Sequence, residues 1–125
     1  MKLNEYFESN KGVGVLSTAD SGGKVNAALY GRPHVMDDET VAFIAADRLT
    51  HANLLTNPHA VFLFKEDGRY EGRRLYLTKT REEKDSPLIE EIARKKYAEE
   101  EGGGKTRFLI YFKVDKVLPL IGEGK

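Results

Sequence analysis

The sequence contains no cysteine among its 125 residues. This absence excludes disulfide frameworks, thiolate nucleophiles, zinc knuckles and cysteine-ligated iron–sulfur clusters. Any redox chemistry would therefore need a bound cofactor.

An excess of charge of one sign is also missing, since Lys and Arg number 20 and Asp and Glu number 20. Without a net positive field, we expect no nucleic-acid partner, although local basic clusters are compatible with this balance.

Long apolar runs are absent as well. No stretch approaches the roughly 20 apolar residues of a membrane-spanning helix. The start Met1–Glu5 has no basic region followed by an apolar run. We therefore expect a cytosolic protein that does not associate with a membrane. We also expect a single domain over residues 1–125, because domains commonly have about 100 to 150 residues.

Short segments of alternating or continuous apolar character are present, separated by turn residues, and they are typical of β-strands. The six segments are residues 13–18, 25–30, 40–46, 60–66, 74–79 and 107–117. The third, Thr40–Ala46, is apolar nearly throughout, which predicts burial on both faces. Tyr30 to His34 is assigned to the end of the second strand, and Met36–Glu39 to a turn. The pattern predicts a mainly β fold with a few helices, a six-stranded antiparallel Greek-key barrel.

Helices are predicted at three places. Apolar residues at helical spacing indicate one helix in the first ten residues and another over residues 49–55, which Pro58 ends. Ser86 and Pro87 supply an N-cap and a first-turn proline for a third helix. The buried stripe of this third helix is expected to contain Ile89, Ile92, Ala93 and Tyr97. Residues 99–104, which are charged and then glycine-rich, are expected to form a flexible connection.

The segment from Ala46 to Val61 contains the pattern Asn-Leu-x-x-Asn-Pro-x-x-Val, beginning at Asn53. It resembles the phosphate-binding turn and following helix of flavin mononucleotide (FMN)-binding split barrels, the pyridoxamine 5'-phosphate oxidase-like family. Three further segments match that family in order and spacing, namely residues 12–20, 30–34 and 74–78. Together the matches span most of the chain. The resemblance implies a split barrel of the FMN-binding type.

The resemblance also implies a homodimer with FMN near the subunit interface and the phosphate held by the turn after the third strand. A phosphate site needs backbone N–H groups and a cation or hydroxyl donor, which Arg48 and Thr50 supply, with Arg32 as a second cation. The family commonly has a lysine three residues before the Asn-Leu pair, where this chain has Thr50, so Arg48 must carry the charge. The other candidate cofactor contacts are Ala28, Leu29, Tyr30, Ile44, Ala45, Ala46, Leu49 and Asn53.

Two classes of function are compatible with these residues. The first is an FMN-dependent oxidoreductase or reductase of an unidentified small molecule, in which the flavin itself carries the redox chemistry. The second is an FMN-binding electron carrier or redox sensor that exchanges electrons with a protein partner. Haem and deazaflavin are alternative ligands, because a fold does not determine function. No residue is assigned a catalytic role, and the resemblance is not taken to imply the vitamin B6 oxidase reaction.

Other polar residues are assigned no chemistry. The histidines His34, His51 and His59 are not spaced like metal ligands, so no metal site is predicted. We expect His51 and His59 on the surface, because they lie near turn residues. Acid–base roles are not assigned to Glu82 and Glu83, because they flank a charged helix in polar surroundings and are expected on a solvated face. The basic residues around the fifth strand are expected to form a solvated face: Arg69, Arg73, Arg74, Lys79 and Arg81.

Overall fold

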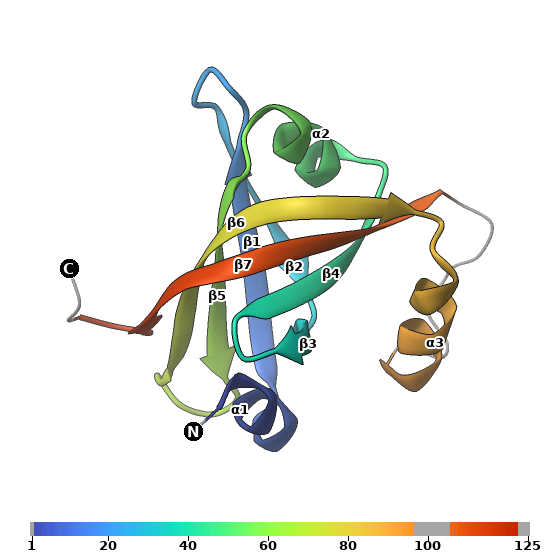
Figure 1. The fold of residues 1–125 in the computed structure, drawn as a ribbon. Coiled ribbons are helices and arrows are strands. Elements are labelled where there is room, and N and C mark those ends of the chain that lie inside the picture. Colours follow the sequence, from blue (N-terminus) through green and yellow to red (C-terminus); the bar gives the residue numbers. More distant parts are fainter. Residues whose placement is uncertain (1, 97–105, 123–125) are drawn as a thin grey trace.

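The structure, a computed structural model, describes residues 2–96 and 106–122, with side chains for residues 2–92 and 106–122. Its strands form one sheet in the order β2-β1-β5-β6-β7-β4-β3 (Figure 1). Each neighbouring pair in this order is antiparallel. The strands are β1 Gly12–Ala19, β2 Val25–Tyr30, β3 His34–Asp37, β4 Thr40–Ala46, β5 His59–Glu66, β6 Gly72–Lys84 and β7 Arg107–Pro119.

The sheet curls on itself without closing. The β1–β2 and β3–β4 hairpins flank the β5-β6-β7 meander, so β2 and β3 are the two ends of the strand order. Within the described residues, no ladder joins these two edge strands. Instead, the ring of Tyr30 in β2 meets that of Phe43 in β4 edge-on, with centroids 5.8 Å apart. The result is a split barrel whose edges meet through side-chain packing.

The described residues form seven strands, whereas the sequence predicted six. The difference is β3, whose residues the sequence pattern divides between the end of the second strand and a turn. Pro33 interrupts the chain after β2, because proline has no backbone N–H to donate to a ladder. His34 then begins a short strand that pairs with β4 through His34 opposite Ala42 and Val35 opposite Val41. A strand of 4 residues is too short for alternation to reveal.

The three predicted helices are present as α1 Leu3–Ser9, α2 Leu49–Thr56 and α3 Pro87–Lys96. In Figure 1, α1 and α2 lie at opposite ends of the barrel, and α3 lies outside it. Ser86 caps α3, since the Leu88 N–H donates to its Oγ at 3.1 Å. No helix in the described ranges is both long and apolar enough to cross a membrane.

Large apolar side chains from alternate strand positions fill the barrel. β7 contributes Phe108, Ile110 and Phe112, and β5 contributes Phe62 and Phe64. The rings of Phe62 and Phe64 are fully shielded from solvent. Apolar side chains of the helices at the two ends complete this core: Tyr6, Phe7 and Leu54.

β4 is buried on both faces, which confirms the prediction for Thr40–Ala46. Val41 and Phe43 point into the barrel, while Ala42 and Ile44 pack on its outer side. There they join a second apolar cluster that α3 covers, formed with Ile89, Ile92, Leu109 and Tyr111. The side chain of Ala93, Tyr97 and the predicted connection at residues 99–104 lie outside what the structure describes.

A buried polar contact fastens α1 to the β5–β6 hairpin. The Tyr6 hydroxyl donates to Glu66 Oε2 at 2.6 Å, and Arg69 pairs with the same carboxylate at 3.1 Å. The guanidinium of Arg73 lies over the Tyr6 ring, 4.1 Å from its centroid. The hydrogen bond from Tyr6 lowers the pKa of Glu66, against the opposing effect of burial and with help from Arg69. Glu66 is therefore ionised when the protein is folded at neutral pH.

We expect Glu66→Gln to flatten the dependence of stability on acid pH. Because folding lowers the pKa of Glu66, its stabilising contribution is present above the ordinary value of 4.5 and is lost as pH falls through the lowered value. Urea unfolding on both sides of pH 4.5 should show a steeper acid loss in the unaltered protein than in the variant. Glu8→Gln is the control, because that carboxylate is exposed and makes no ion pair with the residues that the structure describes. Equal slopes for the unaltered protein and E66Q would contradict the prediction.

Candidate functional site

The first turn of α2 presents backbone N–H groups that have no acceptor. The N-cap residue is Arg48, whose backbone is extended and whose side chain makes no capping bond. The Ala52 N–H makes the first helical bond, to the Arg48 carbonyl at 3.0 Å. The N–H groups of Leu49, Thr50 and His51 are thus unpaired within the described part of the chain. Free amides at the positive end of a helix dipole favour an anion.

Arg48 adds a positive charge at the same place. Its side chain is exposed and makes no hydrogen bond or ion pair with the residues the structure describes. A free guanidinium can form two parallel hydrogen bonds with phosphate oxygens.

The charge of Arg48 also affects the pKa of the Tyr30 hydroxyl. Burial raises the pKa of the Tyr30 hydroxyl, while a hydrogen bond with Thr50 and the charge of Arg48 act in the opposite direction. The hydroxyl therefore keeps its proton at neutral pH and is available as a donor.

Thr50 belongs to the framework of the site. Its side chain is buried, and its Oγ1 accepts a hydrogen bond of 3.4 Å from Nδ2 of Asn26 in β2. The contact with Tyr30 ties it to the same strand. Thr50 consequently offers its backbone N–H, rather than a free hydroxyl, to a ligand at the helix start. Asn26 was not among the predicted site residues.

Asn53 anchors the other side of α2. Its Nδ2 donates to Oγ1 of Thr18 in β1 at 3.0 Å, and both side chains are buried. Its carbonyl accepts from the Asn57 N–H at 2.9 Å, which ends the helix just before Pro58. The Asn-Leu-x-x-Asn-Pro pattern therefore has a structural role, because it fixes where α2 lies and where it stops.

Three candidates from the sequence do not join this cluster. Arg32 donates to the carbonyls of Phe7 at 2.6 Å and Asn10 at 3.2 Å, so its guanidinium is engaged at the end of α1. Leu29 is 75% exposed on the outer side of β2. Ile44 packs against the cluster that α3 covers. Strand alternation separates these side chains from their neighbours in sequence.

The remaining candidates lie in the strands and turn that adjoin the start of α2. Ala28 shares the half-buried face of β2 with Tyr30. Ala45 belongs to the core, whereas Ala46 is exposed at the end of β4. Leu49 is 55% exposed on α2 itself. Of the two alanines, only Ala46 therefore leaves accessible backbone beside Arg48.

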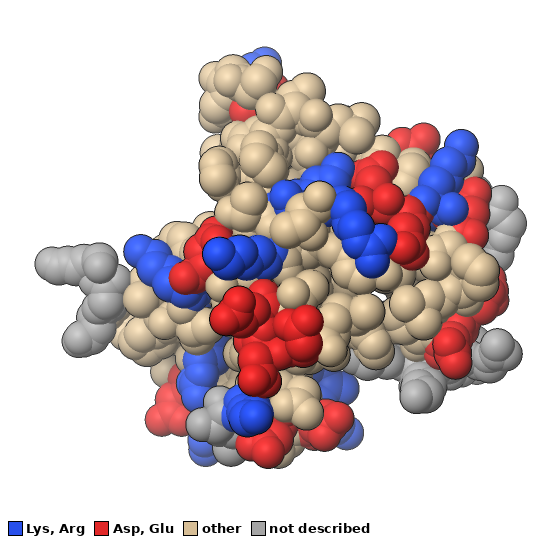
Figure 2. Space-filling view, in the orientation of Figure 1, with Lys and Arg blue, Asp and Glu red and all other residues tan. Residues whose placement is uncertain are grey.

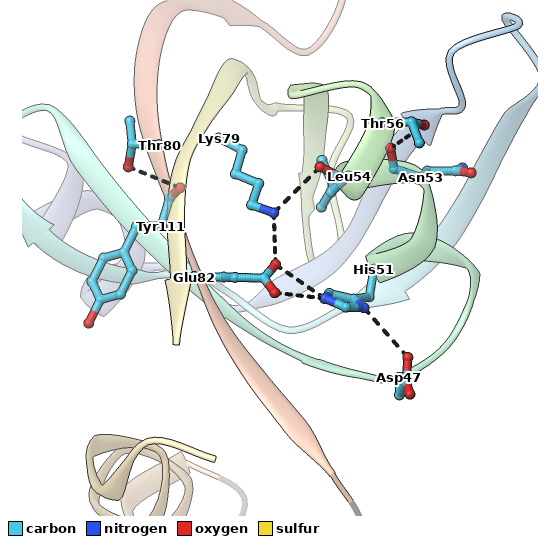
Figure 3. Close-up of polar contacts among 9 residues, drawn as sticks. All are labelled: Asp47, His51, Asn53, Leu54, Thr56, Lys79, Thr80, Glu82 and Tyr111. Atoms are coloured by element: carbon cyan, nitrogen blue, oxygen red, sulfur yellow. Dashed lines mark hydrogen bonds and ion pairs between the residues drawn. The ribbon is translucent and has the colours of Figure 1, made fainter. Parts of the chain in front are cut away.

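His51 is buried beneath α2, so the expectation that it lies on the surface is wrong. Its ring is only 5% exposed and stacks on Phe108 with centroids 3.6 Å apart. Nε2 lies 3.0 and 3.1 Å from the two oxygens of Glu82 (Figure 3). Nδ1 lies 3.5 Å from Oδ1 of Asp47 in the turn before the helix. The ring is therefore held from three sides. His59, in contrast, is exposed as expected.

Glu82 in turn is held by Lys79. The Lys79 Nζ donates to Glu82 Oε1 at 2.7 Å and to the Leu54 carbonyl of α2 at 3.4 Å (Figure 3). Burial would raise the pKa of Glu82, but the hydrogen bonds from His51 and Lys79 outweigh it and the pKa is lowered. Lys79 and Glu82 were expected on a solvated face, whereas only 13% and 23% of their side chains are exposed. This network links α2 to β6.

A β-bulge explains why the sequence concealed the network. The register between β6 and β7 shifts between Lys79 and Arg81. As a result Lys79 lies opposite Phe112 and Glu82 opposite Ile110, which both point into the barrel. Two residues three apart thus share the inner face, which strict alternation forbids.

The surface divides into mixed charge and uncharged areas. Basic and acidic side chains are interspersed over much of the face drawn in Figure 2, while the part over the β1–β2 turn and α2 is mostly uncharged. The outer side of β2, β1 and β5 carries exposed apolar residues. Val15 in β1 lies opposite Leu29 of β2 and Leu63 of β5. Val13 and Val25 are 51% and 83% exposed on the same strands. We refer to these five residues as the outer apolar face.

Comparison with known proteins relates this arrangement to solved structures. Neither a protein-family model nor a curated protein sequence matches the chain. The solved structure of an FMN-binding protein from Syntrophomonas wolfei subsp. wolfei matches with a TM-score of 0.75 and 22% identity, covering 98% of this chain and 86% of that chain. This chain has the FMN-binding split-barrel fold.

Two further structures share this split-barrel fold. A candidate pyridoxamine 5'-phosphate oxidase from Listeria innocua matches at TM-score 0.69 and 17% identity, covering 94% of each chain. HutZ, the haem storage protein from Vibrio cholerae, matches at TM-score 0.67 and 18% identity, also covering 94% of each chain. The resemblance found in the sequence is thus confirmed for the fold. The set also shows that split barrels of this shape serve proteins with different ligands.

Proposed function

We propose that this split barrel binds FMN, with the phosphate at the first turn of α2. The observation that carries the proposal is the coincidence of unpaired amides at Leu49, Thr50 and His51 with the unpaired guanidinium of Arg48. The donor set suits a dianionic phosphate, which accepts hydrogen bonds from amides and charge from a guanidinium. The similar fold of an FMN-binding protein supports the same ligand.

The residues around this turn have the chemical character that the rest of FMN requires. Tyr30 places a protonated hydroxyl next to Thr50 and Arg48, where it can donate to the cofactor. Leu49 and Leu55 expose apolar side chains on α2, and Ala46 leaves backbone accessible at the end of β4. Bound FMN would supply hydride and electron transfer, so this chain needs to bind and orient it rather than provide a catalytic base.

The visible absorption spectrum of gently purified protein tests this proposal first. Oxidised-flavin bands, a released cofactor that co-elutes with FMN, and saturable binding on titration are the expected results. A haem spectrum, a deazaflavin spectrum or an absence of FMN binding would overturn it. The haem possibility has a specific reason, since the haem storage protein HutZ has a similar fold.

We further propose that bound FMN makes the chain an oxidoreductase or reductase of a small molecule. Turnover of reduced nicotinamide donors by the FMN-loaded protein, measured with and without candidate acceptors, tests this step. An electron carrier or redox sensor is the second candidate, because the flavin itself carries the redox chemistry and could exchange electrons with a protein partner. Slow donor oxidation together with fast electron exchange with a protein partner would favour that candidate.

The outer apolar face is proposed as the interface of a homodimer. Monomeric soluble proteins seldom expose large contiguous apolar patches. Leu29 and Leu63 flank Val15 on paired strands, so their side chains form one continuous strip across β2, β1 and β5. β2 also carries Tyr30 and Asn26 on its other side, next to α2. A partner on this face would place the cofactor close to the interface.

Leu29→Lys is expected to weaken the dimer by at least about tenfold, since it places a charge in the apolar strip. The fold should survive, because Leu29 is 75% exposed in the single chain. Sedimentation equilibrium over a range of protein concentrations measures the effect. Ile121→Lys, at a residue 64% exposed elsewhere, is the matched control and should leave association unchanged. A monomeric unaltered protein, or equal association of both variants, would contradict the proposed interface.

A further inference from the structure

The turn before α2 contains an acidic residue where the proposed site needs to receive an anion. Asp47 lies directly before the N-cap residue Arg48. The helix dipole favours a carboxylate near a helix start, and one that turned toward the free amides could accept their hydrogen bonds as an N-cap side chain does. A carboxylate placed in that way would occupy the amides and repel a phosphate. Asp47 makes no such capping bond to the described amides of α2.

His51 accounts for the position of Asp47. One turn further along α2, its Nδ1 lies 3.5 Å from Asp47 Oδ1. The His51 ring cannot follow the carboxylate toward the helix start, because it is stacked on Phe108 and bonded through Nε2 to Glu82. Lys79 holds Glu82 from the far side at 2.7 Å. With Nε2–H donated to Glu82, Nδ1 holds the Asp47 carboxylate when it carries a proton as well, because only the doubly protonated imidazole donates from both nitrogens. The contact to Asp47 is then made by a side chain that is fixed independently of the turn.

We propose that His51 is a positioning residue for the phosphate end of the site: it holds the Asp47 carboxylate off the free amides of α2. The Asp47–Arg48 turn then keeps the amides and the Arg48 guanidinium available to a phosphate. This inference rests on the proposed FMN site. It gives a role to the buried contacts among His51, Glu82 and Lys79, which do not themselves bind the cofactor. His51 does not touch the ligand in this scheme.

The test compares two flavins that differ only in the phosphate. His51→Gln retains an amide donor that can reach Glu82, but it removes the contact to Asp47. We expect H51Q to weaken FMN binding by about tenfold, while the affinity for riboflavin, which lacks the phosphate, changes by less than about twofold. Fluorescence titration measures both affinities. His59→Gln, at an exposed histidine, is the matched control and should change neither.

Asp47→Asn distinguishes positioning from a structural role. If His51 acts by restraining the Asp47 charge, adding D47N to H51Q should restore most of the lost FMN affinity. Equal loss of FMN and riboflavin binding in H51Q, or no recovery in the double variant, would overturn the proposal. Should H51Q fail to fold, Glu82→Gln provides the second variant, with the same selective loss of FMN expected at a smaller size. An unaltered protein that binds no FMN would overturn the proposed function itself.

Discussion

Arg48→Ala is expected to weaken FMN binding by about tenfold to a hundredfold. A hydrogen bond to a charged group contributes about 1.5 to 3 kcal/mol, and each tenfold change in affinity corresponds to about 1.4 kcal/mol. The described residues offer no other unpaired cation at the first turn of α2 that could replace the guanidinium. Isothermal titration of FMN into the cofactor-free variant gives the affinity directly. The affinity for riboflavin should change far less, because riboflavin has no phosphate.

The fold should be unaffected by this substitution. Arg48 is exposed and makes no hydrogen bond or ion pair within the described ranges, so its removal leaves no buried group without a partner. Arg32→Ala is the informative control, because both arginines were candidates for the phosphate. Arg32 bonds the carbonyls of Phe7 and Asn10, so we expect R32A to lower stability and to leave the FMN affinity nearly unchanged. The reverse result would place the phosphate near Arg32 and refute the assignment to Arg48.

Whether the sequence predicted a feature depended on how far apart along the chain the interacting residues lie. Alternation correctly indicated a strand over residues 107–117, and Ser86-Pro87 marked the start of α3. These signals are local, because each depends on residues within one element. β3 escaped prediction, since its 4 residues are too few to show a period.

The candidate site was predicted in part for the same reason. The Arg48–Asn53 segment carries its own turn and the start of α2, so the sequence could indicate a turn and a helix there. The side chain of Thr50, in contrast, is occupied by Asn26 from β2, and that contact joins residues 24 positions apart. The contacts of Arg32 were hidden in the same way, because its acceptors lie 25 and 22 residues earlier, in and just after α1. Only the folded chain shows which polar groups are already engaged.

The contacts among His51, Glu82 and Lys79 were the part of the site that the sequence predicted least well. A histidine next to turn residues, a lysine on an alternating strand and a glutamate beside a charged helix each predicted a solvated position. The bulge between Lys79 and Arg81 brings Lys79 and Glu82 to the inner face, and α2 then covers them with His51. A bulge of a single residue in a strand of 13 has no distinct signature in composition or period.

Phe62→Ala is expected to lower the free energy of unfolding by about 3 to 5 kcal/mol, the usual cost of removing a phenylalanine ring from a core. Phe62 is fully buried, and its ring lies 5.0 Å from that of Phe43 and 6.2 Å from that of Phe7. The neighbouring strand carries Gly14 where a Cβ would meet the Phe62 ring at 2.4 Å. Gly14 has no side chain that could move into the space of the lost ring, so a cavity should persist.

The same substitution should also affect the ligand site. Phe62 supports Phe43, and Phe43 in turn meets Tyr30 across the split between the two edges of the sheet. Loss of the ring should therefore loosen Tyr30, and FMN affinity should fall together with stability. Urea unfolding of F62A and of Tyr70→Ala, whose ring is 79% exposed, measures the first effect. Equal stability of these two variants would show that the Phe62 ring does not organise the core. Unchanged FMN affinity in a destabilised F62A would show that the cofactor does not depend on the edge contact.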